Sequence, residues 1–265
     1  MNQENKVGFF EQYLIACFHP LQYKKLLHKK KGALAGYLCV LIFFLVFLES
    51  ILPFAAWNVS VGGLENLFLN RIPKFSLENG QLQSESTYSF TIGGVLHVKV
   101  NSDVEEFEKS DLNEKYVEEI LIGKKSLLVK SPSSVQTISF SQFPQLIFNN
   151  KNLAEMIPVI YLLLAIYGIM LMISKAVQYL FVALVFALIC RGSVRTEDGK
   201  VVSMGQSFRI SLYAKTIFAI IGSVNVALGY LVNSFLLIIL SVMVTMGWII
   251  RAEMSVLGLK TSKAE

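Results

Sequence analysis

Two charged residues inside long apolar runs are the best candidates for chemistry in this sequence. Glu49 lies near the end of the apolar run 33–56, and Lys175 divides the apolar run 156–190. A charged group within a membrane-spanning helix often marks an ion path or a proton relay. Each of these side chains is also long enough to extend to the lipid–water interface, and we expect both to act as separate anchors. Glu49 and Lys175 are therefore candidate polar membrane positions without an assigned role.

Motifs that would support an enzyme are absent from the sequence. It contains no glycine-rich phosphate loop, no His-Glu-x-x-His zinc motif, no Cys-x-x-Cys pair and no Gly-x-Ser-x-Gly nucleophile turn. Its three histidines are scattered rather than spaced as metal ligands: His19, His28 and His97. We therefore expect a protein that is not an enzyme, with no catalytic residue, no cofactor and no metal.

The composition is that of an integral membrane protein. Hydrophobic residues make up 54% of the chain and charged residues only 16%, whereas soluble domains carry about 25% charged residues. The net charge of +5 comes from basic residues that flank apolar runs, a pattern typical of membrane topology and of contact with anionic lipid. The main cluster is expected at the membrane surface and consists of Lys24, Lys25, Lys29, Lys30 and Lys31. No nucleic-acid partner is expected, because the motifs of that class are absent.

The segment that precedes this cluster is amphipathic. Apolar residues recur near one face of a helix, namely Phe10, Leu14, Cys17, Phe18 and Leu21. One interpretation is a helix that lies in the membrane interface, with this stripe at the acyl boundary. The other is a cytoplasmic helix that packs on the membrane helices. The sequence does not choose between them.

The predicted fold class is a membrane α-helical bundle of four spans, with five possible, and an inserted extracytoplasmic β-rich domain. The spans are expected at 33–56, 154–190, 211–232 and 235–250, since a helix needs about 20 apolar residues to cross the hydrocarbon core. The β-rich domain is expected at 57–153. The remaining segments are expected in the cytoplasm: an amphipathic and basic N-terminal segment at 1–32, a basic loop at 191–210 and a tail at 251–265.

The run 156–190 is too long for one upright span and short for two. A helical hairpin at Lys175 would give a fifth span, but no turn motif lies at Ser174–Lys175. A single crossing keeps Arg191, Arg195 and Lys200 in the cytoplasm, as the bias of basic residues towards that side favours. We therefore expect one long crossing, with Lys175 near the inner interface.

The expected β-rich domain is marked by alternating apolar residues and turn dipeptides. Asn79-Gly80 favours a two-residue hairpin loop after the segment KFSLE. YSFTI, VLHVKV, SLLVKS and VQTISF are the further strand candidates. Between them, the acidic stretch EEFEKSDLNEKYVEE lacks the spacing of a calcium loop, so we expect a solvated face.

Four stretches carry a resemblance to a known family: FFEQYLIACFHPLQYKK, IPKFSLENGQL, EILIGKKSLLVKS and SFRISLYAK. In them the chain resembles the MalA-type family, bacterial polytopic membrane proteins of unknown function named from maltodextrin-utilisation operons. The membrane part is also weakly similar to the Yip family. The resemblance implies a bacterial plasma-membrane protein and a link to maltodextrin utilisation or to the envelope. It brings no catalytic residue with it.

These observations together predict a multi-pass plasma-membrane protein whose N-terminus is cytoplasmic. Its extracytoplasmic domain would sense, bind or scaffold something at the cell surface. The alternative is an accessory subunit of a membrane transport complex, with a permease or an envelope complex as its partner. In either case the lipid bilayer, including its anionic lipids, is an expected partner.

Overall fold

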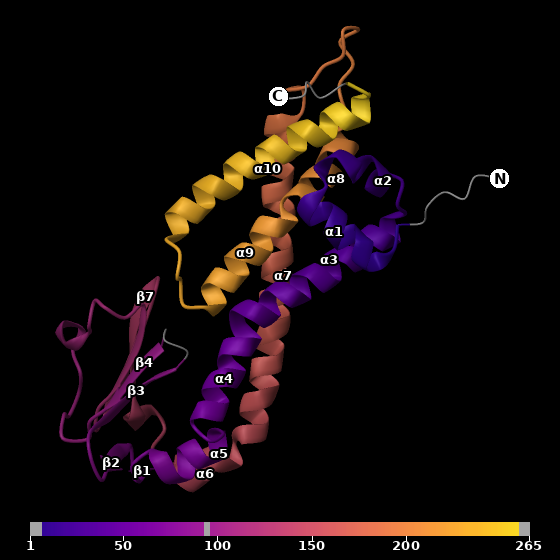
Figure 1. The fold of residues 1–265 in the computed structure, drawn as a ribbon. Coiled ribbons are helices and arrows are strands. Elements are labelled where there is room, and N and C mark those ends of the chain that lie inside the picture. The colour runs from indigo at the N-terminus through magenta and orange to yellow at the C-terminus, as the bar shows by residue number, and fades with distance from the viewer. Residues whose placement is uncertain (1–6, 93–95, 260–265) are drawn as a thin grey trace. The chain divides into compact units, whose positions relative to one another are not determined.

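The computed structural model describes residues 7–92 and 96–259 of the chain (Figure 1). The chain forms two compact units, a helical unit of Met1–Leu52 with Tyr167–Glu265 and a β-rich unit of Pro53–Ile166. Within the described residues, four helical stretches are long and apolar enough to cross a membrane. They are Lys31–Ser60, Ile157–Cys190, Met204–Ala227 and Ser234–Leu257. The structure therefore contains four apolar helices that could span a membrane, and separate β-sheet regions, as expected.

These four stretches are built from the longer helices of the chain. The first contains α3 (Lys31–Val46), a π turn η2 (Phe47–Ile51) and α4 (Leu52–Ser60). The others are α7 (Ile157–Cys190), α8 (Met204–Ala214) with α9 (Thr216–Ala227), and α10 (Ser234–Leu257). Shorter helices are α1 (Phe9–Phe18), η1 (Pro20–Gln22), α2 (Tyr23–Leu27), α5 (Leu64–Asn66), η3 (Leu67–Arg71) and α6 (Asn150–Glu155).

Residues 157–190 form one unbroken helix of 34 residues. The backbone does not reverse at Lys175, so the five-span alternative, which needed a helical hairpin there, is wrong. At a rise of 1.5 Å per residue the helix is about 51 Å long, longer than the roughly 30 Å hydrocarbon core. Helix α7 therefore extends beyond the hydrocarbon or is tilted within it.

Two helices extend further than expected. Helix α8 begins at Met204, inside the segment 191–210 that was expected to be a loop, because Ser203 and Gln206 form a capping box at its start. Helix α10 continues beyond residue 250 to Leu257, and Gly258 ends it in a left-handed conformation. The segments expected as a basic loop and a cytoplasmic tail are therefore partly helical.

The N-terminal helix α1 packs on the helical unit, as one of the two alternatives expected. One face packs into the core of the helical unit and buries Gln12, Ile15, Ala16 and Cys17. The other face exposes an apolar stripe of Phe10, Leu14 and Phe18, with side chains 57–81% exposed. The prediction that Cys17 belongs to this stripe is wrong, because its side chain is buried. Helix α1 therefore packs on other helices and also presents an apolar face outward.

Buried tyrosines organise the core of the helical unit. Tyr23, Tyr37 and Tyr213 are fully buried. The hydroxyl groups of Tyr37 and Thr216 form a hydrogen bond of 2.6 Å, which joins α3 to α9. The Tyr179 hydroxyl of α7 donates to the Leu212 carbonyl at 2.6 Å. These bonds satisfy buried polar groups that would otherwise destabilise the packed helices.

The β-rich unit contains two sheets. The three-stranded sheet has the order β2-β1-β8 and the five-stranded sheet the order β3-β4-β5-β6-β7. Their strands are β1 (Phe75–Glu78), β2 (Gln81–Ser84), β3 (Tyr88–Ile92), β4 (Leu96–Val100), β5 (Glu118–Ile122), β6 (Ser126–Ser131), β7 (Ser134–Ser139) and β8 (Phe148–Asn149). Neighbours are antiparallel except β4 and β5, which are parallel.

The predicted hairpin is present, with Asn79 and Gly80 as its two loop residues. Both have positive φ angles, 51° and 70°, as the primed turns that match strand twist require. Each predicted strand segment contains a strand in the structure, although Val95 of the segment VLHVKV lies outside the described residues and Phe140 of VQTISF follows the end of its strand. Strand β5 was not predicted, because its first residues belong to the acidic stretch.

The acidic stretch is therefore not wholly a solvated face. Glu119 is only 2% exposed, and its carboxylate accepts a hydrogen bond of 2.7 Å from the backbone N–H of Asn113. Phe107 from the same stretch packs on Leu121 and Leu128, at one face of the five-stranded sheet. The stretch therefore covers that face of the sheet, while residues that alternate with Leu121 and Leu128 point to the opposite face.

Candidate functional site

The structure joins the two candidate polar positions, Glu49 and Lys175, in one ion pair. The Lys175 Nζ atom lies 2.7 Å from both carboxylate oxygens of Glu49. The Ser223 hydroxyl of α9 donates to Glu49 Oε1 at 2.6 Å. The expectation that the two residues act as separate interfacial anchors is wrong, because each charge is neutralised by the other. Pairing of this kind is the usual arrangement for charged residues within spanning helices.

A local irregularity of the helix surrounds Glu49. Residues 47–51 form a π turn in which the Leu52 N–H bonds to the Phe47 carbonyl. Pro53 has no N–H to offer the Glu49 carbonyl one turn earlier, so regular α-helical bonding ends there. Such π turns are frequent at functional sites. The sequence signal that could have revealed it is the proline that follows the glutamate by four residues.

The ion pair borders a cavity of about 410 Å³ within the helical unit, which is lined by both polar and apolar side chains. Lys215 also lines this cavity, at the junction of α8 and α9. Its ammonium group lies 4.3 Å from the centre of the Tyr179 ring and 3.4 Å from the Tyr179 carbonyl oxygen. The cavity therefore holds two cations and one carboxylate, and the polar residues Gln178, Asn225 and Ser241 complete its wall. We assign no reaction to this arrangement.

A buried acid in α10 was missed by the sequence analysis. Glu253 is completely buried, and its Oε1 atom accepts a hydrogen bond of 2.7 Å from the Ser207 hydroxyl. Its second oxygen has no partner among the described residues. Residue 253 was placed in a polar tail, so only the continued helical period could have revealed its burial.

The basic cluster is largely exposed, as a surface role requires. Lys24, Lys25, Lys30 and Lys31 are exposed, and the partly buried Lys29 donates to the Val7 carbonyl. The cluster is held in place by a residue from far along the chain. Arg209 of α8 donates to the Leu27 carbonyl at 3.0 Å, where α2 ends, which satisfies a carbonyl that the helix leaves free.

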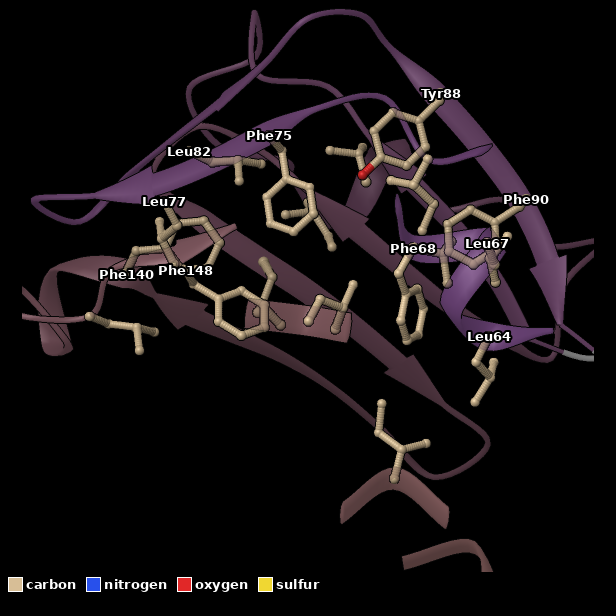
Figure 2. Close-up of a pocket in the computed structure, with 18 of the residues that line it drawn as sticks. Leu64, Leu67, Phe68, Phe75, Leu77, Leu82, Tyr88, Phe90, Phe140 and Phe148 are labelled. Atoms are coloured by element: carbon tan, nitrogen blue, oxygen red, sulfur yellow. The ribbon is translucent and has the colours of Figure 1, made fainter. Parts of the chain in front are cut away.

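A second candidate site is an apolar cavity of about 600 Å³ in the β-rich unit (Figure 2). Its walls come from both sheets, with Phe75 and Leu77 on β1, Tyr88 and Phe90 on β3, and Phe148 on β8. Every lining residue within the described ranges is uncharged and predominantly apolar. Ligand pockets are typically 300–1,000 Å³ and mostly apolar, so the cavity has the size and chemistry of a binding site.

The same alternation that forms the strands also lines this cavity. Phe75 and Leu77 alternate on β1, as Tyr88 and Phe90 do on β3 and Val98 and Val100 do on β4. Tyr88 is the one lining residue with a hydroxyl group, and its oxygen points towards the other lining side chains (Figure 2). Burial raises the pKa of this phenol to about 12, so the hydroxyl stays protonated and can donate a hydrogen bond at neutral pH.

The cavity also has walls from helices of the β-rich unit. Phe54 and Trp57 of α4, and Ile160 and Leu164 of α7, are among the lining residues. Both helices belong to stretches that are long and apolar enough to cross a membrane. The sequence analysis identified strands and spans here but no cavity, since a void is a property of packing rather than of any short motif.

Comparison with known proteins assigns a family without assigning a function. Residues 10–250 match the family described as "Protein of unknown function (DUF1189)". No curated protein and no solved structure matches the chain. The predicted links to the MalA-type and Yip families are not shown by these matches. The match includes residues of both units and of all four candidate spans, and the chain belongs to the DUF1189 family.

Proposed function

We propose that this protein is a multi-pass bacterial plasma-membrane protein that binds an apolar ligand in its β-rich unit and acts without catalysis. In this proposal the N-terminus is cytoplasmic and the β-rich unit lies on the outer side, where it senses or scaffolds envelope components. The apolar cavity is the observation that carries the proposal.

The size of the cavity supports an occupied state. The cavity is partly open to its surroundings, so its space leaves apolar side chains uncovered. A space of about 600 Å³ is far larger than the voids of a packed core, which seldom exceed the size of a water molecule. Ordered water would find few partners there, because a buried water needs two to four polar groups and the lining supplies almost none. An apolar ligand would cover these side chains and remove them from water.

The chemistry of the lining favours the envelope over maltodextrin. A sugar carries hydroxyl groups, and each of them needs a hydrogen-bond partner when it leaves water. The cavity offers the Tyr88 hydroxyl and the Trp57 indole N–H, and its other described lining residues have purely hydrocarbon side chains. Of the two links that the sequence suggested, an envelope role therefore fits this cavity better than a maltodextrin-binding role.

The distribution of basic residues supports the proposed orientation. Four exposed lysines precede the first span, and Arg191, Arg195 and Lys200 follow the second. Basic residues close to the ends of spans favour the cytoplasmic side. Both groups satisfy this bias only if the segment between the first two spans, which includes the β-rich unit, lies outside.

The orientation is tested by cysteine labelling in intact cells. Glu114 and Asp198 are exposed positions in the β-rich unit and in the basic loop. Each is replaced by cysteine in a variant that has alanine at Cys17, Cys39 and Cys190. A membrane-impermeant maleimide should label Glu114→Cys in intact cells, and Asp198→Cys only after the cells are permeabilised. Labelling of Asp198→Cys in intact cells, or protection of Glu114→Cys, would overturn the proposed orientation.

A further inference from the structure

The lining of the apolar cavity comes from two kinds of structure. The two sheets supply residues such as Leu77 and Phe148 (Figure 2) and also Val98. Trp57 of α4 and Ile160 of α7 come from helical stretches that continue as candidate membrane spans. Tryptophan is enriched where spanning helices reach the lipid headgroups. The ligand that these surroundings would supply in greatest abundance is membrane lipid.

The lining matches an acyl chain more closely than other apolar ligands of the envelope. An acyl chain is flexible and needs no hydrogen bonds, so it suits a cavity whose described lining residues carry no charge. The Tyr88 hydroxyl and the Trp57 indole N–H are the two donors among the described lining side chains, which suits a ligand with ester carbonyls at one end of a hydrocarbon chain. Peptides and sugars carry several polar groups that would lose their partners here.

We infer that the cavity of the β-rich unit binds an acyl chain of a membrane phospholipid. The chain lies between the two sheets, and its ester end lies towards the wall formed by α4 and α7. This inference rests on the proposed function and names the ligand class of the same site. Because the β-rich unit would take this acyl chain out of the bilayer, it would respond to the lipid composition of the outer leaflet.

Photolabelling with lipid probes tests the inference on the full chain. The protein is reconstituted in vesicles of phosphatidylethanolamine and phosphatidylglycerol, in which a fraction of the phospholipid carries a diazirine at the end of one acyl chain. After irradiation and digestion, mass spectrometry locates the adducts. We expect adducts on sheet residues such as Leu77, Val98 and Phe148 in addition to the spanning helices. Adducts confined to the spanning helices would overturn the inference.

A matched pair of variants makes the labelling specific to the cavity. Val98→Trp places a larger side chain in the cavity, whereas Val117→Trp places the same side chain at a position that is 60% exposed and outside the lining. We expect Val98→Trp to reduce sheet adducts at least threefold relative to adducts on the spanning helices, and Val117→Trp to leave the ratio unchanged. Equal ratios in both folded variants would contradict the inference. If Val98→Trp fails to fold, the positions of the adducts on the unmodified chain still test the inference.

Failure of this inference can be told apart from failure of the proposed function. Sheet adducts with Glu114→Cys accessible only from inside would keep the lipid ligand and reject the proposed orientation. Sheet residues free of adducts, with Glu114→Cys labelled in intact cells, would keep the orientation and reject the lipid ligand.

Discussion

The pairing of Glu49 with Lys175 predicts that the loss of one charge is worse than the loss of both. Glu49→Gln leaves the Lys175 ammonium without its carboxylate partner and keeps the size of the side chain. The double variant Glu49→Gln with Lys175→Met removes both charges and retains most of the packing volume. We therefore expect the single variant to be clearly destabilised and the double variant to recover most of that loss.

The magnitude follows from the geometry of the pair. Breaking a buried pair by removing one partner costs about 3–5 kcal/mol, because the remaining charge is left uncompensated. The side chains of Lys175 and Glu49 are 27% and 21% exposed, so the lower end, about 3 kcal/mol, applies to Glu49→Gln. For a chain of this size that corresponds to a decrease of about 6–12 °C in Tm. The double variant should lose less than about 1 kcal/mol, since replacing a buried pair by apolar groups is often neutral.

The assay is thermal unfolding of the purified full chain in one mild detergent, with tryptophan fluorescence as the signal. Ser223→Ala is the matched control, because it removes the hydroxyl that donates to Glu49 and leaves both charges paired. Loss of one hydrogen bond to a charged group costs about 1.5–3 kcal/mol, so this control should be destabilised without any rescue by Lys175→Met. Additive effects of Glu49→Gln and Lys175→Met, within about 0.5 kcal/mol, would refute the pairing.

Three further outcomes are expected. Gly123→Ala should destabilise the protein by about 1–3 kcal/mol, because an added Cβ would lie 3.0 Å from the Val104 carbonyl oxygen. Gly32→Ala is the control, because Gly32 has open space around it, and it should not lower Tm in the same melting assay. Burial raises the pKa of the Tyr88 phenol to about 12, so the stability that the neutral phenol contributes is present below about pH 10 and is lost as the pH rises through about 12. The decrease in Tm between pH 9 and pH 11.5 should therefore be smaller for Tyr88→Phe than for the unmodified protein. An equal decrease in both proteins would contradict this. Glu253→Gln should keep the hydrogen bond from Ser207 and change the free energy of unfolding by less than about 1 kcal/mol. Glu253→Lys should abolish the folded state, because it buries an unpaired cation. A stable Glu253→Lys protein in the same melting assay would refute the burial of this side chain.

Features that depend on neighbouring residues could be predicted from the sequence. The hairpin at Asn79-Gly80 was predictable because two adjacent residues with positive φ angles, 51° and 70°, select the turn without help from the rest of the fold. The four apolar helices were predictable because every residue of a span must be compatible with hydrocarbon, so each span appears in the sequence as a continuous apolar run. Strand β5 was missed because its first residues are acidic and because it forms through pairing with β4, which is separated from it by an intervening segment.

The contact between Glu49 and Lys175 could not be predicted in this way. The two residues are separated by 126 positions, and no local preference selects one partner over another at such a distance. Each was interpreted alone as an interfacial anchor, because a single long charged side chain near an interface is usually explained by its reach. The pair forms because α3, η2, α7 and α9 pack together, and this packing depends on the entire helical unit.

The residues that line the cavity could be predicted from local pattern, whereas the cavity itself depends on the packing of the whole unit. Alternation on β1, β3 and β4 determines which side chains point away from solvent, and residues such as Phe75 and Tyr88 are identified by it. It does not determine whether opposing faces meet, because that depends on the separation of two sheets whose strands come from distant segments. A core of aromatic residues that met fully would leave few voids larger than a water molecule. The proposed apolar ligand accounts for the retained space of about 600 Å³, and the absence of lipid adducts on both sheets would remove that explanation.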